Sequence, residues 1–282
     1  MAETQRPLLV VDGDSFAHRA FHGLPKSIRR AGNRGGGAIV GFANYLIRLV
    51  EAETPRAVIV GWDTLDVPNW RALEFAPYQG GREFDDEIVD QLSVLPEFVA
   101  ACGFANGKAA GFEADDFLAS AVAAEEASGG EALVASGDRD AFQLASERTT
   151  ILHPVKAGEI ARIGPAQVRE RYGVDPHQVP DFIALRGDPS DKLPGAKGVG
   201  EKTAASLLQR YPDLDAILAD GKFPAQAEDL RLYRRIATMV TSAPIPPLPD
   251  MVATWSRASA LAKVWELNNL AERLAQLAKT QG

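Results

Sequence analysis

"PLLVVDGD", residues 7–14, is a short apolar run that ends in a turn rich in acidic residues. Runs of this kind are typical of buried parallel strands that carry functional groups at their carboxyl ends. The same pattern recurs in "AVIVGWD" (57–63) and "ALVASGD" (132–138). Three predicted strands therefore each lead into an aspartate: Asp12, Asp63 and Asp138.

Helical segments alternate with these strands. We predict helices over 38–53, 86–103 and 113–127, the second of them interrupted by Pro96. Alternating strands and helices predict an α/β fold with a mainly parallel central sheet flanked by helices. Ligand sites in such sheets lie beyond the carboxyl ends of the strands. We therefore expect the three aspartates to meet at one edge of the sheet.

The remaining segments have less distinct boundaries between predicted elements. Residues 64–85 form a long connection with two prolines, a glycine pair and little periodicity, and connections of this length are often lids or binding elements. Short helices broken by Gly and Pro follow a boundary near residue 175, which predicts units of 1–175 and 176–282. In the tail, "PIPPLPD" (244–250) predicts a stiff connector, and 259–279 predicts a single closing helix.

Composition limits the possible classes of protein. A chain of 282 residues with 46% hydrophobic residues is ordinary for a soluble globular protein. The single Cys102 excludes an intrachain disulfide framework and favours a reducing compartment, the cytoplasm. No apolar stretch approaches the roughly 18 residues of a membrane span, so no membrane partner is expected. A net charge of −8 argues against nucleic-acid binding unless the acids gather at a metal site and bases line another surface.

Acidic residues collect at the ends of the predicted elements. "GFEADDFLAS" (111–120) places three carboxylates within four positions at the head of a helix, which is more than helix capping needs. Their mutual repulsion is tolerated more readily when a cation neutralises it. Any one such residue could be a plain turn or cap residue. A shared metal site explains them together: Asp12, Asp63, Glu113, Asp115, Asp116, Asp138, Asp140, Asp188 and Asp191.

A pocket of carboxylates without His or Cys partners suits hard cations such as Mg²⁺ or Mn²⁺. A set this large predicts two or more ions, with some of the acids acting through water. Two such ions can clamp the attacking and leaving oxygens of a phosphodiester displacement. The sequence contains neither a nucleophile elbow nor a P-loop. These patterns predict metal-dependent hydrolysis of phosphodiesters.

"LPGAKGVGEKTAASLLQRY" (193–211) combines closely spaced glycines, lysines and the start of a helix. Glycines let a tight turn bring backbone N–H groups close to an anion at a helix N-terminus. Such a grip on phosphates positions a duplex without reading its sequence. A helix-turn-helix with solvated lysines is the alternative. The candidate DNA-binding residues here are Gly195, Lys197, Gly198, Gly200, Lys202 and Thr203.

Four stretches, "VVDGD", "GFEADD", "SGDRDAFQL" and "DFIALRGDPSDKLPGAKGVGEKTAASLL", together resemble the 5′-nuclease (flap endonuclease) superfamily. The likeness is to the 5′→3′ exonuclease domain of bacterial DNA polymerase I and its free-standing relatives, and it covers roughly residues 7–215. It implies a PIN-like core, a helical arch and a C-terminal helix-hairpin-helix (H3TH) region. It also implies that the nine acids are metal ligands and that a K⁺ ion binds backbone carbonyls of the hairpin.

The same resemblance identifies residues 64–85 as the arch through which a single-stranded 5′ end reaches the metals. "WRALEFAPYQGGR" matches the arch pattern at Arg71 and Arg82, which would be catalytic, and at Tyr78, which would contact DNA. The family commonly has Lys after this Tyr, but here stands Gln79. That Lys is expected to steer the scissile phosphate, a role that a neutral amide fills poorly. Slower catalysis, or compensation by either arginine, would follow.

The resemblance implies a stand-alone, monomeric, structure-specific 5′-nuclease of replication and repair. Its partners would be DNA with 5′ flaps, 5′ overhangs, nicks or gaps, with a functional link to a DNA polymerase and a ligase. Its location would be the cytoplasm, associated with the nucleoid. One alternative is a catalytically weak branched-DNA-binding homologue. Another is a phosphatase for small phosphomonoesters, which leaves the hairpin unexplained.

Overall fold

The computed structural model describes residues 6–64, 67–81, 84–155 and 158–281. Its main sheet has six strands in the order β5-β4-β1-β6-β7-β8. Neighbouring strands are parallel except β8, which runs antiparallel to β7. The predicted mainly parallel sheet is confirmed. The strands are β1 (Leu8–Asp12), β4 (Ala57–Gly61), β5 (Ala105–Gly107), β6 (Ala132–Ala135), β7 (Thr149–Pro154) and β8 (Ile160–Ile163).

The three strands that lead into aspartates are neighbours at the centre of this sheet. β1 pairs with β4 on one side and with β6 on the other, so that Leu8 lies opposite both Ala57 and Ala132. Because all three run in the same direction, the residues that follow them reach the same edge. The expected meeting of Asp12, Asp63 and Asp138 at one edge follows from this register.

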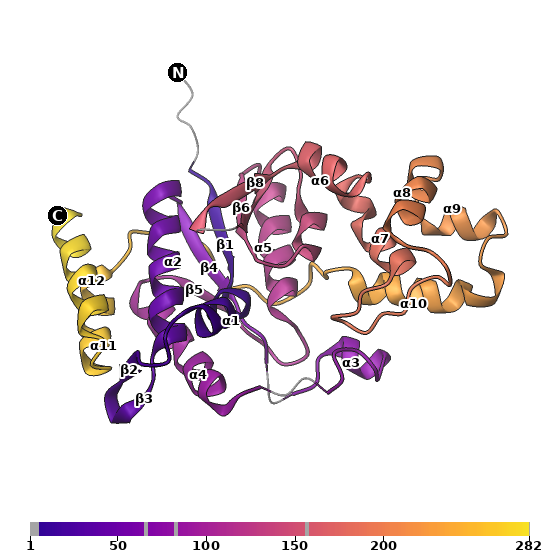
Figure 1. The fold of residues 1–282 in the computed structure, drawn as a ribbon. Coiled ribbons are helices and arrows are strands. Elements are labelled where there is room, and N and C mark those ends of the chain that lie inside the picture. Colours follow the sequence, from indigo (N-terminus) through magenta and orange to yellow (C-terminus); the bar gives the residue numbers. More distant parts are fainter. Residues whose placement is uncertain (1–5, 65–66, 82–83, 156–157, 282) are drawn as a thin grey trace, which may run out of the picture.

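Both faces of the sheet are covered by helices (Figure 1). Leu9 and Val11 of β1 face a core shared with α1 (Gly13–Gly23), α2 (Gly37–Glu53) and α4 (Asp86–Ala101). Leu8 and Val10 face the opposite core, shared with α5 (Ala114–Ala127). Burial on both faces explains why β1, β4 and β6 are continuous apolar runs rather than alternating ones.

The later helices form two groups at opposite ends of the molecule (Figure 1). One group continues from α6 (Pro165–Tyr172) and comprises α7 (Val179–Arg186), α8 (Glu201–Arg210), α9 (Leu214–Ala219) and α10 (Ala227–Ala237). The other is the pair α11 (Trp255–Val264) and α12 (Asn268–Thr280), which packs against α2 and α4. The smaller elements include a hairpin of β2 (Arg29–Arg30) and β3 (Arg34–Gly35), and α3 (Trp70–Glu74).

The proline-rich stretch expected as a connector crosses the molecule between these two groups. It contains no helix or strand. The Arg56 guanidinium donates to the Leu248 carbonyl at 2.7 Å, and the Met251 amide donates to the Arg56 carbonyl at 2.8 Å. Both contacts fix the connector beside β4. In the described part of the chain, no helix is long and apolar enough to cross a membrane.

Two predictions about helices are wrong. α4 runs through Pro96 without interruption, because the buried Leu95 and Phe98 beside it outweigh the one lost backbone hydrogen bond. The single closing helix predicted over 259–279 is in fact α11 and α12, separated by a turn in which Glu266 has a φ of +58°. Packing of the two helices on each other keeps this turn in place.

Candidate metal-binding active site

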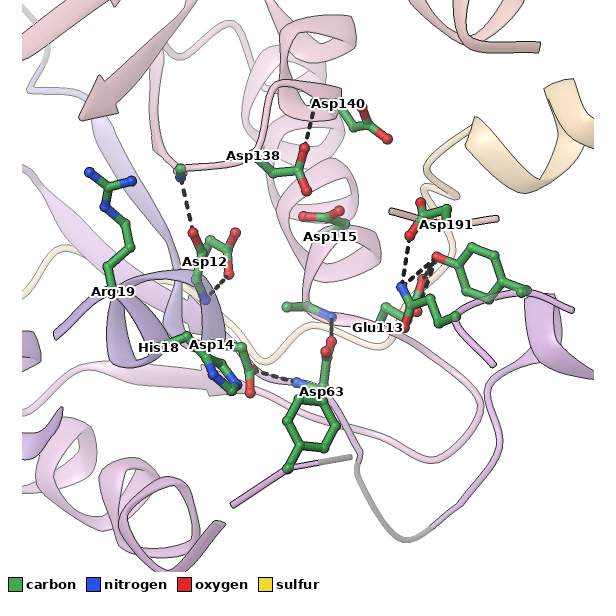
Figure 2. Close-up of a pocket in the computed structure, with 16 residues that line it drawn as sticks. Asp12, Asp14, His18, Arg19, Asp63, Glu113, Asp115, Asp138, Asp140 and Asp191 are labelled. Carbon is green, nitrogen blue, oxygen red and sulfur yellow. Dashed lines mark hydrogen bonds between the residues drawn. The ribbon is translucent and has the colours of Figure 1, made fainter. Parts of the chain in front are cut away.

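A cavity of about 440 Å³ opens at the carboxyl edge of the sheet (Figure 2). Polar and aromatic side chains line it beside the acids, among them Ser15, His18, Arg19, Tyr78 and Gln79. Seven of the nine predicted acids lie here, together with Asp14, which the sequence analysis missed although it lies two residues after Asp12. The eight carboxylates are Asp12, Asp14, Asp63, Glu113, Asp115, Asp138, Asp140 and Asp191.

Ser136 ties the ends of β1 and β6 together within this cavity. Its hydroxyl donates to Asp12 Oδ2 at 2.7 Å and accepts from the Asp138 amide at 3.0 Å. Asp12 Oδ1 accepts from the Ser15 amide at 2.9 Å, as the N-cap of α1. The Asp12 carboxylate is therefore held in one orientation at the centre of the site.

Asp63 joins β4 to the helix that carries the acidic triplet. Its amide donates to Asp14 Oδ2 at 2.8 Å, and its Oδ1 accepts from the Ala114 amide at 2.7 Å, at the first residue of α5. A carboxylate at a helix N-terminus is stabilised by the helix dipole. On the opposite side, Asp138 Oδ1 accepts from the Asp140 amide at 2.9 Å. Short backbone contacts thus hold neighbouring carboxylates close together.

Burial and mutual repulsion shift the protonation of these acids. Burial raises the pKa of Asp12 to about 7 against the hydrogen bonds from Ser136 and Ser15, and the charges of Asp63 and Asp138 raise it further. Burial likewise raises the pKa of Glu113 to about 7. The pKa values of Asp14, Asp115 and Asp140 are raised well above the ordinary range, first by burial and then by neighbouring carboxylates.

This donor set fits divalent cations. Burial, and after it mutual repulsion, raises the pKa values of these carboxyl groups, and a cation among them would stabilise the ionised carboxylates. Within the described residues, no three Asp, Glu, His or Cys side chains form a ready-made metal site. Ions held here would therefore share their coordination with water and with substrate oxygens, which is the usual habit of Mg²⁺.

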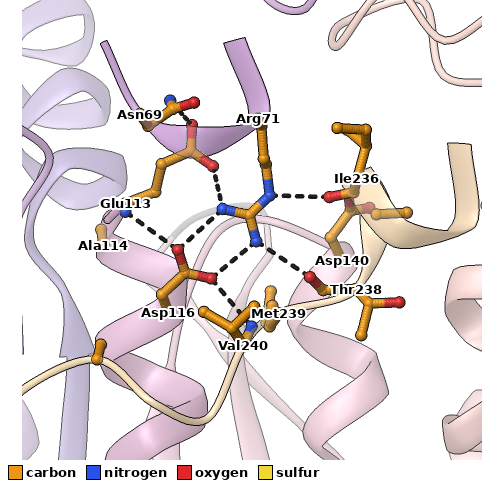
Figure 3. A network of polar contacts seen from close by, with 12 residues as sticks. Asn69, Arg71, Glu113, Ala114, Asp116, Asp140, Ile236, Thr238, Met239 and Val240 are labelled. Atoms are coloured by element: carbon orange, nitrogen blue, oxygen red, sulfur yellow. Dashed lines mark hydrogen bonds and ion pairs between the residues drawn. The ribbon is translucent and has the colours of Figure 1, made fainter. Parts of the chain in front are cut away.

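Asp116 points away from the cavity into a buried network (Figure 3). Its two oxygens accept from the Arg71 guanidinium at 2.7 and 2.9 Å. They also accept from the backbone amides of Glu113 at 3.2 Å and Val240 at 3.0 Å. The predicted metal role for Asp116 is corrected accordingly, because these four donors occupy the carboxylate.

Arg71 does not face the cavity either, and its side chain is 3% exposed. Besides Asp116 it contacts Glu113 Oε2 at 2.7 Å and the carbonyls of Ile236 at 2.8 Å and Thr238 at 3.1 Å. Burial would lower the pKa of Arg71, but the two carboxylates raise it above its usual value. The predicted catalytic role is corrected to a structural one, in which Arg71 joins α3, α5 and the end of α10.

Asp188 likewise supports the site without lining the cavity. Its Oδ1 accepts from the backbone amides of Ser190 at 2.8 Å and Asp191 at 3.4 Å, and its Oδ2 accepts from Arg186 at 3.3 Å. The backbones of Asp188 and Leu193 pair at both ends of this turn. The turn directs Asp191 into the cavity, so the predicted metal role of Asp188 is corrected to one of shaping the loop.

The arch segment forms the rim of the cavity, and its described part contains one helix, α3, followed by a turn. The buried Tyr78 hydroxyl lies 3.0 Å from Glu113 Oε2, and burial raises its pKa. Gln79 Nε2 donates to this hydroxyl at 2.9 Å and to Asp191 Oδ1 at 3.3 Å. The predicted catalytic residue Arg82 lies outside the described residues.

A second cavity, of about 410 Å³, shares Tyr78 and Gln79 with the first. Its remaining lining includes Val67, Pro68 and Phe112. The two cavities also share Asp63, Phe84 and Glu113. Tyr78 and Gln79 therefore border both an acidic chamber and a partly apolar one, which is called the outer cavity below.

The glycine-rich hairpin lies between α7 and α8, as the resemblance implied. Gly195 has a φ of +75°, and a Cβ on it would lie 2.4 Å from the Gly187 amide nitrogen, so only glycine allows this contact. Lys197 is exposed in the hairpin loop, and Lys202 and Thr203 are exposed at the start of α8. The helix-hairpin-helix is confirmed, with its lysines open to solvent.

A basic groove, which the sequence analysis did not anticipate, adjoins the acidic cavity. It has a volume of about 960 Å³ and is lined by Arg19, Arg139, Arg171 and His153, and it shares Arg19 and Gly137 with the cavity. Within the described ranges, none of the three arginines forms an ion pair with a carboxylate. The arginines lie more than 30 residues apart in the sequence or on separate elements, so no local motif marks the groove.

Family models match nearly the whole chain. Residues 7–173 match the 5′-3′ exonuclease N-terminal resolvase-like domain, and residues 174–258 match the 5′-3′ exonuclease C-terminal SAM fold. DNA polymerase I of Mycobacterium bovis is 36% identical over 264 residues, which is 89% of this chain and 29% of that protein. The thermostable DNA polymerase I of Thermus thermophilus is 35% identical over 254 residues, 86% of this chain and 30% of the relative.

The chain thus spans under a third of the length of these curated relatives. Among solved structures, the T5 5′-exonuclease with bound zinc ions superposes with a TM-score of 0.69 at 18% identity, covering 97% of this chain and all of the other. This likeness confirms the fold: a resolvase-like core joined to a helical C-terminal region.

Proposed function

The chain belongs to the 5′-3′ exonuclease family, and from that premise we propose that it is a metal-dependent nuclease that hydrolyses DNA phosphodiesters at 5′ ends and 5′ flaps. One observation carries the proposal: eight carboxylates line a single cavity at the carboxyl edge of the sheet, beneath a rim built by the arch. The products would be a 5′-phosphate on one fragment and a 3′-hydroxyl on the other.

Seven carboxylates are the proposed holders of the metal. Bound among them, two Mg²⁺ or Mn²⁺ ions would stabilise the charge that develops on the attacking and leaving oxygens of the phosphodiester. Ser136 and Ser15 fix the orientation of the central Asp12 through two hydrogen bonds. The proposed ligand set is Asp12, Asp63, Glu113, Asp115, Asp138, Asp140 and Asp191.

The rim would position the single strand. Tyr78 and Gln79 lie between the acidic chamber and the outer cavity, so a strand passing from one to the other crosses them. The apolar walls of the outer cavity, including Val67 and Phe112, offer surfaces for nucleobases. The backbone phosphates would then enter the chamber, where carboxylates and water replace the bulk solvent.

We propose that residues 1–175 form the hydrolytic core, to which the loop after α7 adds Asp191, and that residues 176–282 provide the main duplex grip. The exposed Lys197 and Lys202, with the backbone of Gly198 and Gly200, face solvent at the start of α8. A K⁺ ion on hairpin carbonyls belongs to this part of the proposal. The basic groove at Arg139 and Arg171 would bind backbone phosphates on the other side of the cavity, since its arginines have no described acidic partner.

The proposed substrates are 5′ flaps, 5′ overhangs, nicks and gaps in DNA, acted on by a monomer associated with the nucleoid in the cytoplasm. Removal of a flap that leaves a 5′-phosphate beside a 3′-hydroxyl creates an end that a ligase can seal. The support for a link to a polymerase and a ligase is therefore the chemistry of the product.

The test is cleavage of a 5′-labelled flap duplex in Mg²⁺ or Mn²⁺, beside an EDTA control and the Asp138→Ala variant. We expect incision near the junction in the parent alone. Asp138 is exposed and packs no core, so the variant should still fold and should bind the flap duplex in Ca²⁺. Binding by the parent without incision in either metal would instead support a branched-DNA-binding protein.

A further inference from the structure

Among the described residues of the arch that form the rim, none places a free cation at the cavity. Gln79 is neutral, and Arg71 is buried against Glu113 and Asp116. A phosphate that approaches eight carboxylates needs a positive charge on its path. Resting on the proposed function, we propose that Lys192 is that charge and that its Nζ binds a phosphate of the single strand at the rim.

Lys192 reaches the rim from the other side of the cavity. Its Nζ donates a hydrogen bond to the Gly80 carbonyl, across 112 positions of sequence. The contact lies one residue from Gln79, and a Cβ on Gly81 would be 3.7 Å from the same Nζ. The ammonium group thus lies beside the arch backbone, next to the neutral side chain of Gln79.

The loop around Lys192 is built to hold it there. Lys192 has a φ of +58°, a conformation that costs a non-glycine residue about 1 kcal/mol or more. Paired backbone hydrogen bonds between Asp188 and Leu193, both at 2.8 Å, close the turn. The adjacent Asp191 side chain faces the cavity and accepts from Gln79. Consecutive residues of one loop therefore contact consecutive residues of the arch.

The present partner of Lys192 is weak enough to exchange for a phosphate. Nζ contacts a neutral carbonyl, and no carboxylate of the described residues forms an ion pair with it. The side chain is exposed. The arginine that lines the cavity, Arg19, comes from α1 and lies on the side opposite Asp191 (Figure 2). Lys192 would complete a set of positive charges on both sides of the entering strand.

The experiment compares Lys192→Asn, Lys192→Arg and the double variant Gln79→Lys/Lys192→Asn with the parent. Asn accepts the left-handed backbone, so the first change removes charge with little strain. We expect its single-turnover cleavage of a 5′-flap duplex to fall about 100-fold. The cleavage rate of Lys192→Arg should stay within about 5-fold of the parent rate. In the double variant, Gln79→Lys should raise the rate at least about 10-fold above that of Lys192→Asn alone. Lys263→Asn, an exposed lysine on α11, is the matched control.

A second readout does not depend on cleavage: the ratio of affinities for the flap duplex and the same duplex without a flap, measured in Ca²⁺. Lys192→Asn should bring this ratio close to one while affinity for the flap-free duplex stays unchanged. A ratio equal to that of the parent, or a Gln79→Lys change that restores nothing, would overturn the role of Lys192. Failure of the parent to cleave would contradict the proposed nuclease, whereas the affinity ratio would still decide on Lys192.

Discussion

At the residue scale, Arg71 shows how a residue of the arch can be essential to structure. Its guanidinium is surrounded by two buried carboxylates and two backbone carbonyls. The Arg71→Ala change would leave Asp116 and Glu113 buried without a cation, and removing one partner of such a pair costs about 3–5 kcal/mol. We expect a loss of that size in the free energy of unfolding measured in urea.

Arg235→Ala is the matched control for Arg71, because Arg235 pairs with Glu74 at 2.5 Å with 61% of its side chain exposed. Exposed pairs contribute about 1 kcal/mol or less. Equal losses in the two variants would show that the buried network adds no stability. If the Arg71→Ala protein is folded and as stable as the parent but fails to cleave, Arg71 has a direct catalytic role.

The sequence located seven of the eight carboxylates that line the cavity, but not the partners of the other predicted acids. Asp12, Asp63 and Asp138 were predictable because each follows a buried strand, and strand ends of a parallel sheet converge. Asp116 was misassigned because a carboxylate near a helix start looks the same whether it binds a metal or an arginine. Only the fold brings Arg71, 45 positions away, to it.

At the element scale, the hairpin between α7 and α8 depends on one glycine for packing and on another only for its turn. A Cβ at Gly195 would collide with the backbone of Gly187, whereas a Cβ at Gly198, also at positive φ, meets nothing within 4 Å. Gly198→Ala should therefore lower the free energy of unfolding by about 1 kcal/mol, from strain alone. Gly195→Ala should lower it by more than twice as much, and equal losses would contradict the close packing.

The hairpin lysines lead to a prediction about binding. Lys202 is exposed in the first turn of α8. Lys202→Ala should weaken duplex binding at every sequence, and the slope of log K against log salt should fall by about one, because one fewer counterion is released. Fluorescence anisotropy across a salt series measures both. Lys263→Ala on α11 is the control. If the slope for Lys202→Ala equals that of the parent, Lys202 does not contact the duplex.

Elements with strong periodicity were predictable, and those set by tertiary contacts were not. The helices over 38–53 and 113–127 are observed within one residue as α2 and α5, because each carries an apolar stripe or a clear start signal. The hairpin of β7 and β8 was missed, since its edge strand β8 is only partly buried. The break between α11 and α12 depends on contacts between the two helices rather than on a helix breaker.

At the scale of the whole molecule, the net charge of −8 conceals a separation of charge. Eight of the acids line one cavity, whereas the adjoining groove is lined by arginines that form no ion pair with any carboxylate of the described ranges, and lysines lie exposed on the hairpin. The net charge alone predicts weak affinity for nucleic acid, because it does not depend on where each charge lies. A phosphate backbone interacts with the local charges rather than with the net charge, so this distribution favours contact at the groove and at the hairpin.

Crowding of carboxylates in the cavity should make the metal-free protein less stable as pH rises. Asp12 and Glu113 have ordinary pKa values of 3.8 and 4.5, and in the folded protein both rise to about 7. The folded state therefore binds more protons than the unfolded state between about pH 4 and 7, so stability falls as pH increases through that window. In EDTA we expect the Tm at pH 8 to be lower than at pH 5.5 by about 5 °C.

A divalent cation should reverse this loss, because it binds the ionised carboxylates of the folded state and not the unfolded chain. Saturating Mg²⁺ should raise the Tm more at pH 8 than at pH 5.5, when differential scanning calorimetry is run at both pH values. Asp115→Asn removes one of the crowded charges of the cavity, so in EDTA this variant should lose less stability between the two pH values than the parent. An equal effect of Mg²⁺ at both pH values would mean that the ion binds elsewhere, since only the cavity links metal binding to these protons.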